Sequence, residues 1–558
     1  MNSSNENTIG KCLLEACYGQ DGNQPAFVTL SNTTSDIFTY QQVWRVLSDY
    51  YFHWWQPQLA VPMKKKKKML AFLCDNDANI WLHYCTVLSS SHYRIVLLNT
   101  RWTALEMAQS LLSSNEQYNE ILLFYNNKAN ESKAQICQAH LNQLSSATMT
   151  MNIAIISLPN YLDKTNLSSG KGSQTNTNTI SSCSSSCGRN RDDAVILFTS
   201  GTSSNQPKGV RLSHASLHKQ AMAKPWGAFH QKYLLASSTP WFHIGGLSSA
   251  LSIFLQGGTF VFATTPNISY NTILPNVNIM VLVPAMIHNI LTSLQNNQEQ
   301  QHCYEHIQVI LVGGSSLSTQ QRMKCRQIFP NARIIQTYAC TEAGSSMTFY
   351  DITHTVKGDS TKYGGGIPVG IPHVDLKIND NGVIATRGIH VMNGYWNSTS
   401  YTKENEWYNT SDLGYLDQKT GMLYYCGRND DVIRTGSESV VAFEVEQYLQ
   451  SLLDNRTVVV IPLPHDKYGQ MICAVLQNDD DDSTYDKQPV QELSPLQFLQ
   501  IKQQWKSLAS YKFPKCIFCM NQFPRNSNGK ILKRKMIPMI QKYIQQQQEK
   551  RPFLISKL

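Results

Sequence analysis

Small hydroxyl and glycine residues follow an apolar stretch near the middle of the chain and could hold phosphate groups. Residues 194–198 are apolar enough to form a buried strand, and the loop after them leads to a Lys-Gly pair at Lys208. Small side chains let backbone N–H groups approach phosphate oxygens, hydroxyls add donors, and a lysine adds compact positive charge. The segment therefore predicts a phosphate site, although it lacks the Gly-Lys-Ser/Thr sequence of a Walker loop. An ordinary surface loop of turn-forming residues is the alternative.

Two carboxylates lie in segments that could serve nucleotide chemistry. Glu342 follows Thr341, and a hydroxyl next to a carboxylate can hold a phosphate oxygen and Mg²⁺ together. Asp412 stands where a strand-like segment ends, and a carboxylate there can accept hydrogen bonds from both hydroxyls of a ribose. Either residue alone is a weak signal, because such pairs arise by chance and aspartate is common in turns.

The last two segments combine glycine with charge. Residues 427–436 place a charged run between glycines, which is typical of a flexible joint with ionic contacts. Further along, Gly529 lets the backbone bend so that Lys530 could reach into a site. Taken by itself, a lysine of this kind more often faces solvent.

These segments need a fold that brings them together. The chain has 558 residues, 42% of them hydrophobic and 16% charged, so it is globular and too long for a single core. Short apolar runs alternate with longer mixed segments and predict an α/β protein. These runs span residues 95–98, 120–124, 194–198, 280–283 and 309–312. Residues 163–190 are rich in Ser, Asn, Thr and Gly, and we expect a loop or a disordered insertion there.

Composition and charge argue against several classes of protein. No run of about 18 apolar residues occurs, so we expect no transmembrane segment. The first residues lack the basic and apolar regions of a secretory signal. The net charge of +9 is a mild excess for this length, and no basic stripe with interleaved aromatic residues predicts binding to nucleic acid. Anionic small molecules are therefore the expected partners.

The five segments occur in the order in which the adenylate-forming superfamily carries its core motifs, and the chain resembles that superfamily over nearly its whole length. Its members are acyl-CoA synthetases, peptide-synthetase adenylation domains and luciferases. The resemblance implies a large N-terminal AMP-binding domain of packed α/β subdomains, residues 1–428, and a small mobile α+β domain, residues 429–558, that carries Lys530. It also implies ATP, Mg²⁺ and coenzyme A. A carboxylic acid attacks the α-phosphorus of ATP, and a thiol then displaces AMP.

The resemblance implies roles for individual residues. Thr341 and Glu342 position phosphate and Mg²⁺, Lys530 stabilises charge at the α-phosphorus, and Asp430 is the hinge of the small domain. The residues implied for the nucleotide and the thiol step are Thr199, Ser200, Gly201, Thr202 and Lys208 for the triphosphate, Gly313, Gly314, Ser315 and Tyr338 around adenine, Asp412 and Arg428 on the ribose, and Gly436 in the thiol step.

Within the superfamily, four stretches are most similar to the 2-succinylbenzoate–CoA ligases of phylloquinone and menaquinone biosynthesis, and the second and the fourth resemble the plant-type enzyme in particular. They are residues 98–102, 242–250, 283–286 and 341–349. The resemblance implies an acyl pocket formed by His243, which is also assigned to catalysis, and by Ser248, Ser249, Ser346 and Thr348. Polar walls suit a substrate with two carboxylates and a ketone better than a fatty acid. The alternatives are another acyl-CoA synthetase for aryl or medium-chain acids, a luciferase-like oxygenase, and a catalytically weak nucleotide-binding protein.

Several positions depart from the family pattern. The phosphate loop is one residue longer than usual, and Ala339, Ser411 and Ser437 replace glycines. Because loss of glycine narrows the backbone angles available, turnover could slow or the loop geometry could shift.

The last three residues, Ser556, Lys557 and Leu558, form a tripeptide that the peroxisomal import receptor reads at a free C-terminus. We therefore expect a peroxisomal protein, and the plant enzymes that the chain resembles include peroxisomal members. A plastid location is the alternative, because a cryptic transit segment is not excluded by composition.

Overall fold

A computed structural model describes most of the chain. The described residues are 8–9, 12–13, 16, 22–31, 34–50, 54–55, 68–89, 93–114, 118, 120–144, 152–160, 162, 191–199, 207–228, 231–263, 268–296, 303–317, 319–354, 366–400, 402–436, 438–453, 456–466, 468–478, 490–505, 508–525 and 531–550. Several predicted features lie outside them, namely the insertion 163–190, Ser200, Gly201, Thr202, Ser437, Lys530 and the tripeptide Ser556, Lys557 and Leu558.

The chain folds as two compact units. The first contains Met1–Thr355, Pro372–Asp375 and Thr386–Tyr408, and the second contains Val356–Ile371, Leu376–Ala385 and Asn409–Leu558. Both units combine helices and strands, which confirms the predicted α/β class. A boundary after Arg428 stays a prediction.

The first unit contains two largely parallel sheets. One has the order β14-β13-β12-β11-β9-β10-β1-β2, in which β2 and β14 run antiparallel to their neighbours β1 and β13. Its strands are β1 Pro25–Leu30, β2 Ser35–Thr39, β9 Tyr233–Leu235, β10 Thr259–Ala263, β11 Ile279–Leu282, β12 Val309–Val312, β13 Arg333–Cys340 and β14 Ser345–Asp351.

The other sheet has the order β18-β8-β7-β4-β3-β5-β6, and β8 runs antiparallel to both β7 and β18. Its strands are β3 Lys68–Leu73, β4 Ile95–Leu97, β5 Glu120–Tyr125, β6 Asn152–Ser157, β7 Asp193–Thr199, β8 Lys208–Ser213 and β18 Gly394–Tyr395. The helices of this unit are α2 Tyr40–Tyr50, α4 Ala78–Val87, α5 Ala104–Leu112, α6 Lys128–Leu144, α8 His214–Met222, α9 Ile244–Leu255, α10 Tyr270–Ile273, α11 Pro284–Asn296 and α12 Thr319–Ile328, with the short 3₁₀ turns η3 Leu274–Asn276 and η4 Thr341–Ala343.

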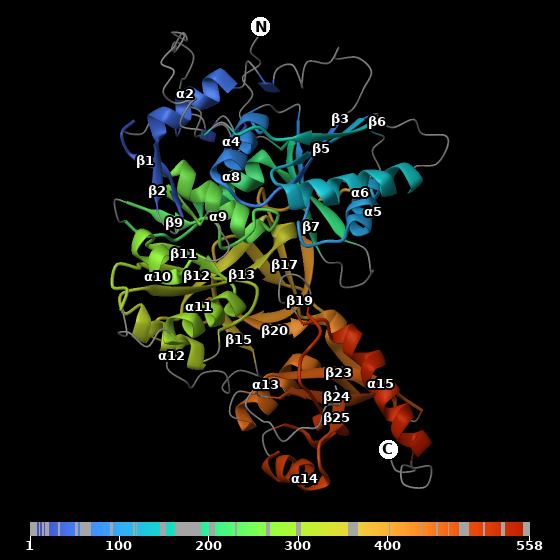
Figure 1. Cartoon of the computed structure of the whole chain (residues 1–558). Helices are drawn as coiled ribbons and strands as arrows, with labels where there is room; N and C mark the ends of the chain where they lie inside the picture. The colour runs from blue at the N-terminus through green and yellow to red at the C-terminus, as the bar shows by residue number, and fades with distance from the viewer. Residues whose placement is uncertain are drawn as a thin grey trace. The chain divides into compact units, whose positions relative to one another are not determined.

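Strand side chains that alternate between the two faces of each sheet build a layered core. In β3, Leu70 joins a central core with α4, α8 and α9, whereas Met69 joins an outer core with α5 and α6. In β12, Leu311 joins the same central core, whereas Ile310 joins another outer core with α11 and α12. The first unit is therefore layered as helices, sheet, helices, sheet and helices (Figure 1).

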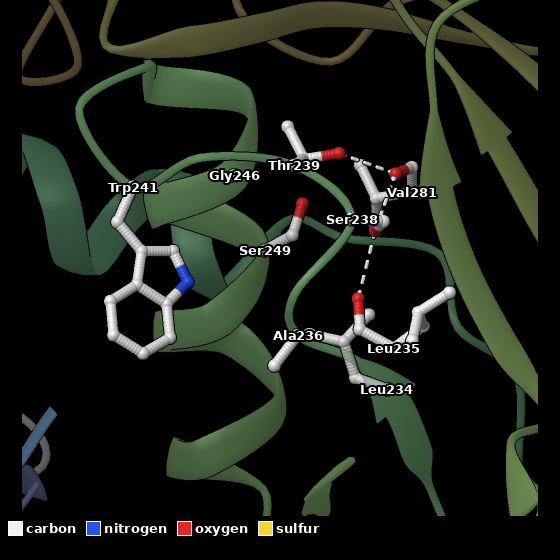
Figure 2. Close-up of a pocket in the computed structure, with 9 residues that line it drawn as sticks. All are labelled: Leu234, Leu235, Ala236, Ser238, Thr239, Trp241, Gly246, Ser249 and Val281. Carbon is white, nitrogen blue, oxygen red and sulfur yellow. Dashed lines mark hydrogen bonds between the residues drawn. The ribbon is translucent and has the colours of Figure 1, made fainter. Parts of the chain in front are cut away.

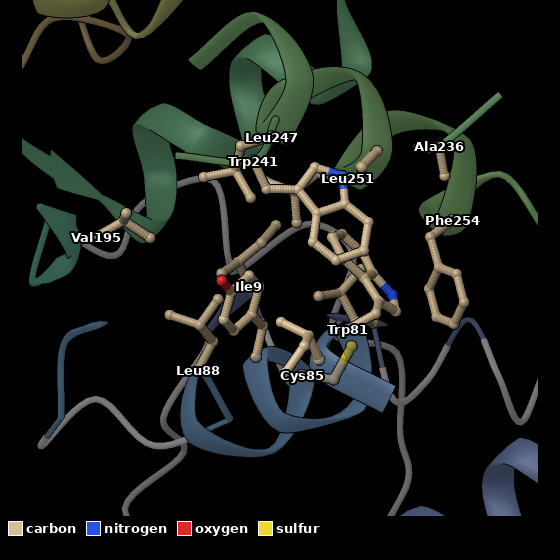
Figure 3. Packing of buried hydrophobic residues seen from close by; sticks show 14 of the residues in the cluster. Ile9, Trp81, Cys85, Leu88, Val195, Ala236, Trp241, Leu247, Leu251 and Phe254 are labelled. Atoms are coloured by element: carbon tan, nitrogen blue, oxygen red, sulfur yellow. The ribbon is translucent and has the colours of Figure 1, made fainter. Parts of the chain in front are cut away.

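Aromatic side chains fill the middle helical layer. Trp81 of α4 lies 5.0 Å from Trp241 and 5.5 Å from Phe254 of α9, measured between ring centroids. Figure 3 shows Trp81 of α4, and Leu88 directly after that helix, facing Leu247 and other apolar residues of α9. This buried contact fixes the start of α9, which carries residues predicted to form the acyl pocket.

The second unit contains two smaller sheets. The first has the order β16-β17-β19-β20-β15, and the second has the order β22-β21-β24-β26-β25 with β23 paired to β24. Their strands are β15 Ile367–Pro372, β16 Asp375–Ile378, β17 Val383–Arg387, β19 Tyr408–Leu416, β20 Leu423–Arg428, β21 Val432–Thr435, β22 Glu438–Val441, β23 Val458–His465, β24 Gly469–Gln477, β25 Val490–Glu492 and β26 Cys516–Met520, and the helices are η5 Asn429–Asp431, α13 Ala442–Leu452, α14 Pro495–Gln504, η6 Ser510–Lys512 and α15 Lys533–Lys550. Among the helices within the described ranges, none combines the length and apolar character needed to cross a bilayer.

Candidate active site

The two ends of the predicted phosphate loop lie side by side in the first unit. β7 ends at Thr199 and β8 begins at Lys208, and these residues are Cα partners in the antiparallel pair. The Thr199 Oγ1 donates to the Lys208 carbonyl at 3.5 Å. The predicted strand before the loop is confirmed, while the middle of the loop falls outside the described residues. The two ends of the loop therefore lie together at one end of the β7–β8 hairpin.

Two tyrosines connect this hairpin to Glu342. Tyr395 on β18 donates from its hydroxyl to Glu342 Oε1 at 3.2 Å, and its oxygen lies 3.3 Å from that of Tyr408. The Lys208 Nζ lies 5.5 Å from the centroid of the Tyr395 ring. Burial, reinforced by the charge of Glu342, raises the pKa of both tyrosines above the usual 10. Both hydroxyls therefore keep their protons at neutral pH and can donate hydrogen bonds.

Thr341 and Glu342 occupy a tightly held turn. They belong to η4, and the C-cap residue Gly344 follows it with a φ of 67°. A Cβ atom at Gly344 would lie 2.5 Å from both the His390 carbonyl oxygen and Ser216 Oγ, so this position needs glycine. Ser216 Oγ in turn donates to the His390 carbonyl at 2.8 Å. The turn therefore fixes the backbone that carries the predicted phosphate and metal residues.

The donor groups around Glu342 fit Mg²⁺ that is held mainly by a nucleotide. Within the described residues, no group of three or more His, Cys, Asp or Glu side chains could hold a metal ion by itself. Mg²⁺ commonly binds one or two carboxylates and takes its other ligands from water and substrate phosphates. Glu342 Oε1 accepts from Tyr395, and the described part of the chain offers no hydrogen-bond donor to Oε2.

The residues predicted around adenine follow neighbouring parallel strands. Gly313, Gly314 and Ser315 come directly after β12, and Tyr338 lies on the adjacent β13. Gly314 has a φ of 82°, and a Cβ at Gly313 would lie 3.6 Å from the Thr337 side chain. The structure therefore brings this glycine turn beside the β13 segment that contains Tyr338. Ligands of open α/β sheets commonly bind at such carboxyl ends.

The predicted acyl-pocket residues come from α9 and β14. His243 is the N-cap residue of α9, and Ser248 and Ser249 are buried on that helix. Ser249 Oγ donates to the Gly245 carbonyl of its own helix at 2.7 Å. A small pocket beside Ser249 is drawn in Figure 2, and it is lined by Leu234, Leu235, Ala236, Ser238, Thr239, Trp241, Gly246, Ser249 and Val281.

On β14, the predicted residues differ in their surroundings. Thr348 Oγ1 accepts from the Tyr338 backbone N–H at 3.4 Å, so its side chain contacts β13. Ser346 instead lies in a cluster of hydroxyl groups with Ser345 and Ser248. The Oγ atoms of Ser345 and Ser248 are 2.9 Å apart. The structure therefore brings Ser248 and Ser346 together, and it places Thr348 and Ser249 in separate hydrogen bonds.

A buried lysine that the motifs did not reveal completes this cluster. Lys224 donates from Nζ to Ser345 Oγ and to Ser346 Oγ, both at 3.1 Å, and only 7% of the residue is exposed. Burial lowers the pKa of its ammonium group to about 7. The sequence around it offers no glycine or charge pattern that would single it out, and its neighbours on β14 are more than a hundred residues away.

The low pKa of Lys224 predicts an unusual dependence of stability on pH. The unfolded chain has the ordinary lysine pKa of 10.5, so between pH 7 and about 10.5 it binds a proton that the folded chain has lost. The free energy of unfolding should therefore rise with pH across that window, and the destabilising effect of the buried charge is complete below pH 7. Burial lowers the pKa of the nearby His373 as well, so that histidine stays neutral over the same range.

Lys224→Met removes this titration. We expect the variant to be more stable than the wild type by about 1–4 kcal/mol at pH 6, because a methionine has no charge to desolvate. The difference in the free energy of unfolding between the variant and the wild type, measured by urea unfolding, should shrink as the pH rises from 7 to 10. A difference that is the same at pH 6 and pH 10 would contradict the low pKa.

In the second unit, the predicted ribose residues form a pair. Asp412 on β19 and Arg428 on β20 are Cα partners, and Arg428 Nε lies 2.7 Å from Asp412 Oδ1. Ser411, one of the lost glycines, keeps a left-handed backbone with a φ of 64°. A serine there costs roughly 1 kcal/mol relative to glycine. The loss of glycine at this position therefore leaves the chain in the strained conformation.

The predicted hinge lies at the end of β20 in the second unit. Asp430 belongs to η5, and Gly436 follows β21 with a φ of 63° and donates its N–H to the Tyr468 carbonyl at 2.8 Å. Arg525 and Ile531 form an antiparallel bridge, which brings together the two ends of the segment that contains Lys530.

Lys533, at the start of α15, forms an ion pair with Asp431, the residue after the predicted hinge Asp430. Lys533 Nζ lies 3.0 Å from Asp431 Oδ2 and 2.8 Å from Glu446 Oε1. Burial alone would lower the pKa of Lys533, but the carboxylates of Glu446 and Asp431 raise it. The lysine is therefore charged at neutral pH and holds both acids.

Comparison with known proteins gives matches over most of the chain. The model of the family described as AMP-binding enzyme matches residues 65–396. The chloroplastic/peroxisomal 2-succinylbenzoate–CoA ligase of Arabidopsis thaliana is 30% identical over 378 residues, which are 61% of this chain and 66% of that protein. The oxalate–CoA ligase of Saccharomyces cerevisiae is 29% identical over 367 residues, covering 62% and 63% of the two chains.

A solved structure shares the fold over nearly the full length. The o-succinylbenzoate coenzyme A synthetase (MenE) of Bacillus subtilis, in complex with ATP and a magnesium ion, has a TM-score of 0.67 and 22% identity. The match covers 94% of this chain and 98% of that one. The similarity at this level of identity concerns the fold.

Proposed function

Because the chain belongs to the AMP-binding enzyme family, we propose that it is an AMP-forming acid–thiol ligase that converts 2-succinylbenzoate to 2-succinylbenzoyl-CoA. The observation that carries the proposal is the connection of Lys208 to Glu342 through the Tyr395 side chain. It joins a cation next to the phosphate loop to a carboxylate suited to Mg²⁺. The Arabidopsis relative, named as a 2-succinylbenzoate–CoA ligase, supports the choice of acid.

In the first step, a carboxylate oxygen of the acid attacks the α-phosphorus of ATP, the bond to the β-phosphate breaks, and pyrophosphate leaves. Thr199, Lys208 and the loop between them would hold the triphosphate, while Asp412 and Arg428 would hold the ribose. Mg²⁺ bound with Glu342 and Thr341 would offset phosphate charge. Lys530 would neutralise the negative charge that grows at the α-phosphate in the transition state, when stabilisation lowers the barrier.

In the second step, the CoA sulfur attacks the acyl carbon of the acyl-adenylate and AMP leaves. We propose that the small domain, residues 429–558, turns at Asp430 between the steps. The turn would carry Lys530 away and bring the Gly436 loop toward the thiol. One domain could then serve both half-reactions, since each needs different groups beside the same acyl carbon.

The acid can be identified by a panel of substrates. We expect pyrophosphate release to be fastest with 2-succinylbenzoate when it is compared with cinnamates, medium-chain fatty acids and oxalate under matched conditions. Oxalate belongs in the panel because a relative is named as an oxalate–CoA ligase. Equal or faster turnover of another acid would reject 2-succinylbenzoate in favour of that acid. ATP binding without pyrophosphate release with any acid would favour a catalytically weak nucleotide-binding homologue.

We further propose that the ligase acts in the peroxisome within phylloquinone or menaquinone biosynthesis. The C-terminal Ser556, Lys557 and Leu558 match the tripeptide that the import receptor reads, and the Arabidopsis relative is named chloroplastic/peroxisomal. A fluorescent protein that ends in these last residues should enter peroxisomes, and the same protein without Leu558 should stay outside them. Import into plastids would instead support the other location.

A further inference from the structure

The buried ammonium group of Lys224 contacts hydroxyl groups but no carboxylate among the residues that the structure describes. It follows directly after α8 and its C-cap residue Ala223. None of the ion pairs between the described residues includes its Nζ, and burial accounts for its lowered pKa. An unpaired buried charge destabilises a fold, and such groups usually pair with a counter-ion or bind a ligand. A methionine in the same space would destabilise the fold less, so the stability of the protein does not explain why a lysine is present here.

The groups around Lys224 are those that would bind a carboxylate on an aromatic ring. Ser345 and Ser346 lie 3.1 Å from Nζ, and Ser248 extends the row of hydroxyls through Ser345. Phe349 lies on one side, with its ring centroid 5.7 Å from Nζ. A carboxylate could accept hydrogen bonds from the ammonium and the hydroxyls together, and charged hydrogen bonds of this kind are the stronger ones.

An aromatic wall borders the same cluster. His373 stacks on Phe349 with centroids 5.0 Å apart and an interplanar angle of 13°, and its Nε2 lies 3.0 Å from the Ser346 carbonyl oxygen. Phe349 is half-buried and His373 is exposed, whereas Lys224 and the serines are buried. The cluster therefore has a flat, partly exposed side next to a buried cation, which suits a planar ring that carries a negative group.

The cluster lies close along the chain to the predicted phosphate residues. Ser345 is the third residue after Glu342, so their Cα atoms are no more than about 11 Å apart. An acid whose reacting carboxylate sits near the phosphates could thus reach Lys224 with a second carboxylate. A long-chain fatty acid would place only methylene groups against the charge, which desolvates it without compensation.

We propose that Lys224 determines specificity by binding the carboxylate that does not react in an aromatic dicarboxylic acid, with Ser345 and Ser346 as hydroxyl partners. This inference rests on the proposed ligase function. It goes further by naming the feature of the substrate that the pocket selects, a second negative charge next to the ring, and the residue that selects it.

The test compares two acids that differ only in that charge. They are 2-succinylbenzoate and 4-oxo-4-phenylbutanoate, which lacks the ring carboxylate. In the wild type, kcat/KM for pyrophosphate release should favour 2-succinylbenzoate by roughly 10- to 100-fold, the range for hydrogen bonds to charged groups. Lys224→Met should lower kcat/KM for 2-succinylbenzoate by the same factor and leave that for 4-oxo-4-phenylbutanoate within about threefold.

Two further variants separate charge from packing. Lys224→Arg keeps the positive charge and should retain part of the preference for the dicarboxylic acid. Lys128→Met removes an exposed lysine from α6 and should leave the preference unchanged. A Lys224→Met variant that loses activity equally with both acids, or a preference that survives the substitution, would overturn the proposal.

The outcome for Lys224 can be separated from that for the proposed function. If the wild type prefers another aromatic dicarboxylic acid, such as benzene-1,2-dicarboxylate over benzoate, and Lys224→Met abolishes that preference, the role of Lys224 stands and 2-succinylbenzoate is wrong. If no acid releases pyrophosphate, calorimetric titration with 2-succinylbenzoate replaces the kinetic test. Binding that weakens at least tenfold in Lys224→Met would then support the proposal, and equal binding would overturn it.

Discussion

Replacing Lys530 with alanine should slow pyrophosphate release by a factor of roughly 10²–10³ and leave the transfer of a supplied acyl-adenylate to CoA nearly unchanged. The reason lies in where charge develops. In the first step, negative charge grows on the phosphorus as the anhydride forms, and one compact ammonium group would neutralise it. In the second step the reacting bond is at the acyl carbon, and the lysine would be elsewhere. The two half-reactions can be measured separately with ATP plus acid and with synthetic acyl-adenylate plus CoA.

The matched control for this prediction is Lys542→Ala. Lys542 is exposed on α15 of the same unit, so its loss should change neither half-reaction. Equal losses in both half-reactions of the Lys530 variant would contradict a two-conformation mechanism. The lysine would then have a structural role, or act in both steps from one position.

The second large effect is expected for Glu342→Gln, which should reduce the rate of acyl-adenylate formation on the order of 10²-fold. The amide keeps the size of the side chain and an oxygen that can accept from Tyr395, but it loses the charge that would bind Mg²⁺. The magnesium concentration needed for half-maximal rate should therefore rise. Its melting temperature should stay close to that of the wild type.

Tyr395→Phe is the control for Glu342. It removes the hydrogen bond to Oε1 and leaves the carboxylate, so its cost should be about tenfold or less. If Tyr395→Phe is as damaging as Glu342→Gln, and neither changes the magnesium requirement, Glu342 serves to hold the tyrosine and another group binds the metal.

Local sequence patterns were sufficient to predict the strands that position the site. The five apolar runs correspond to β4, β5, β7, β11 and β12, because a buried strand has an apolar signature within a few residues. The assignment of strands to two sheets could not be predicted in the same way. In the first unit β9 pairs with both β10 and β11, and this order depends on contacts that no local run encodes.

The candidate site shows the same division. Thr341 and Glu342 were predicted because they stand in a motif, and the structure explains their turn through the left-handed Gly344. Tyr395 and Lys224 were missed because their partners Glu342 and Ser345 are distant in the sequence. The lost glycine at Ser411 was recognised as a departure, but the sequence did not reveal that serine would adopt the left-handed conformation.

The double ion pair of Lys533 bears on how the small domain could move. Its ammonium group forms ion pairs with Asp431, the residue after the proposed hinge Asp430, and with Glu446 of α13. Lys533 is itself the first residue of α15. If the small domain turns at Asp430, these two ion pairs would make α13 and α15 move together as one rigid body. Breaking the ion pairs would then uncouple the domain rotation from the two half-reactions without altering any group that touches the substrate.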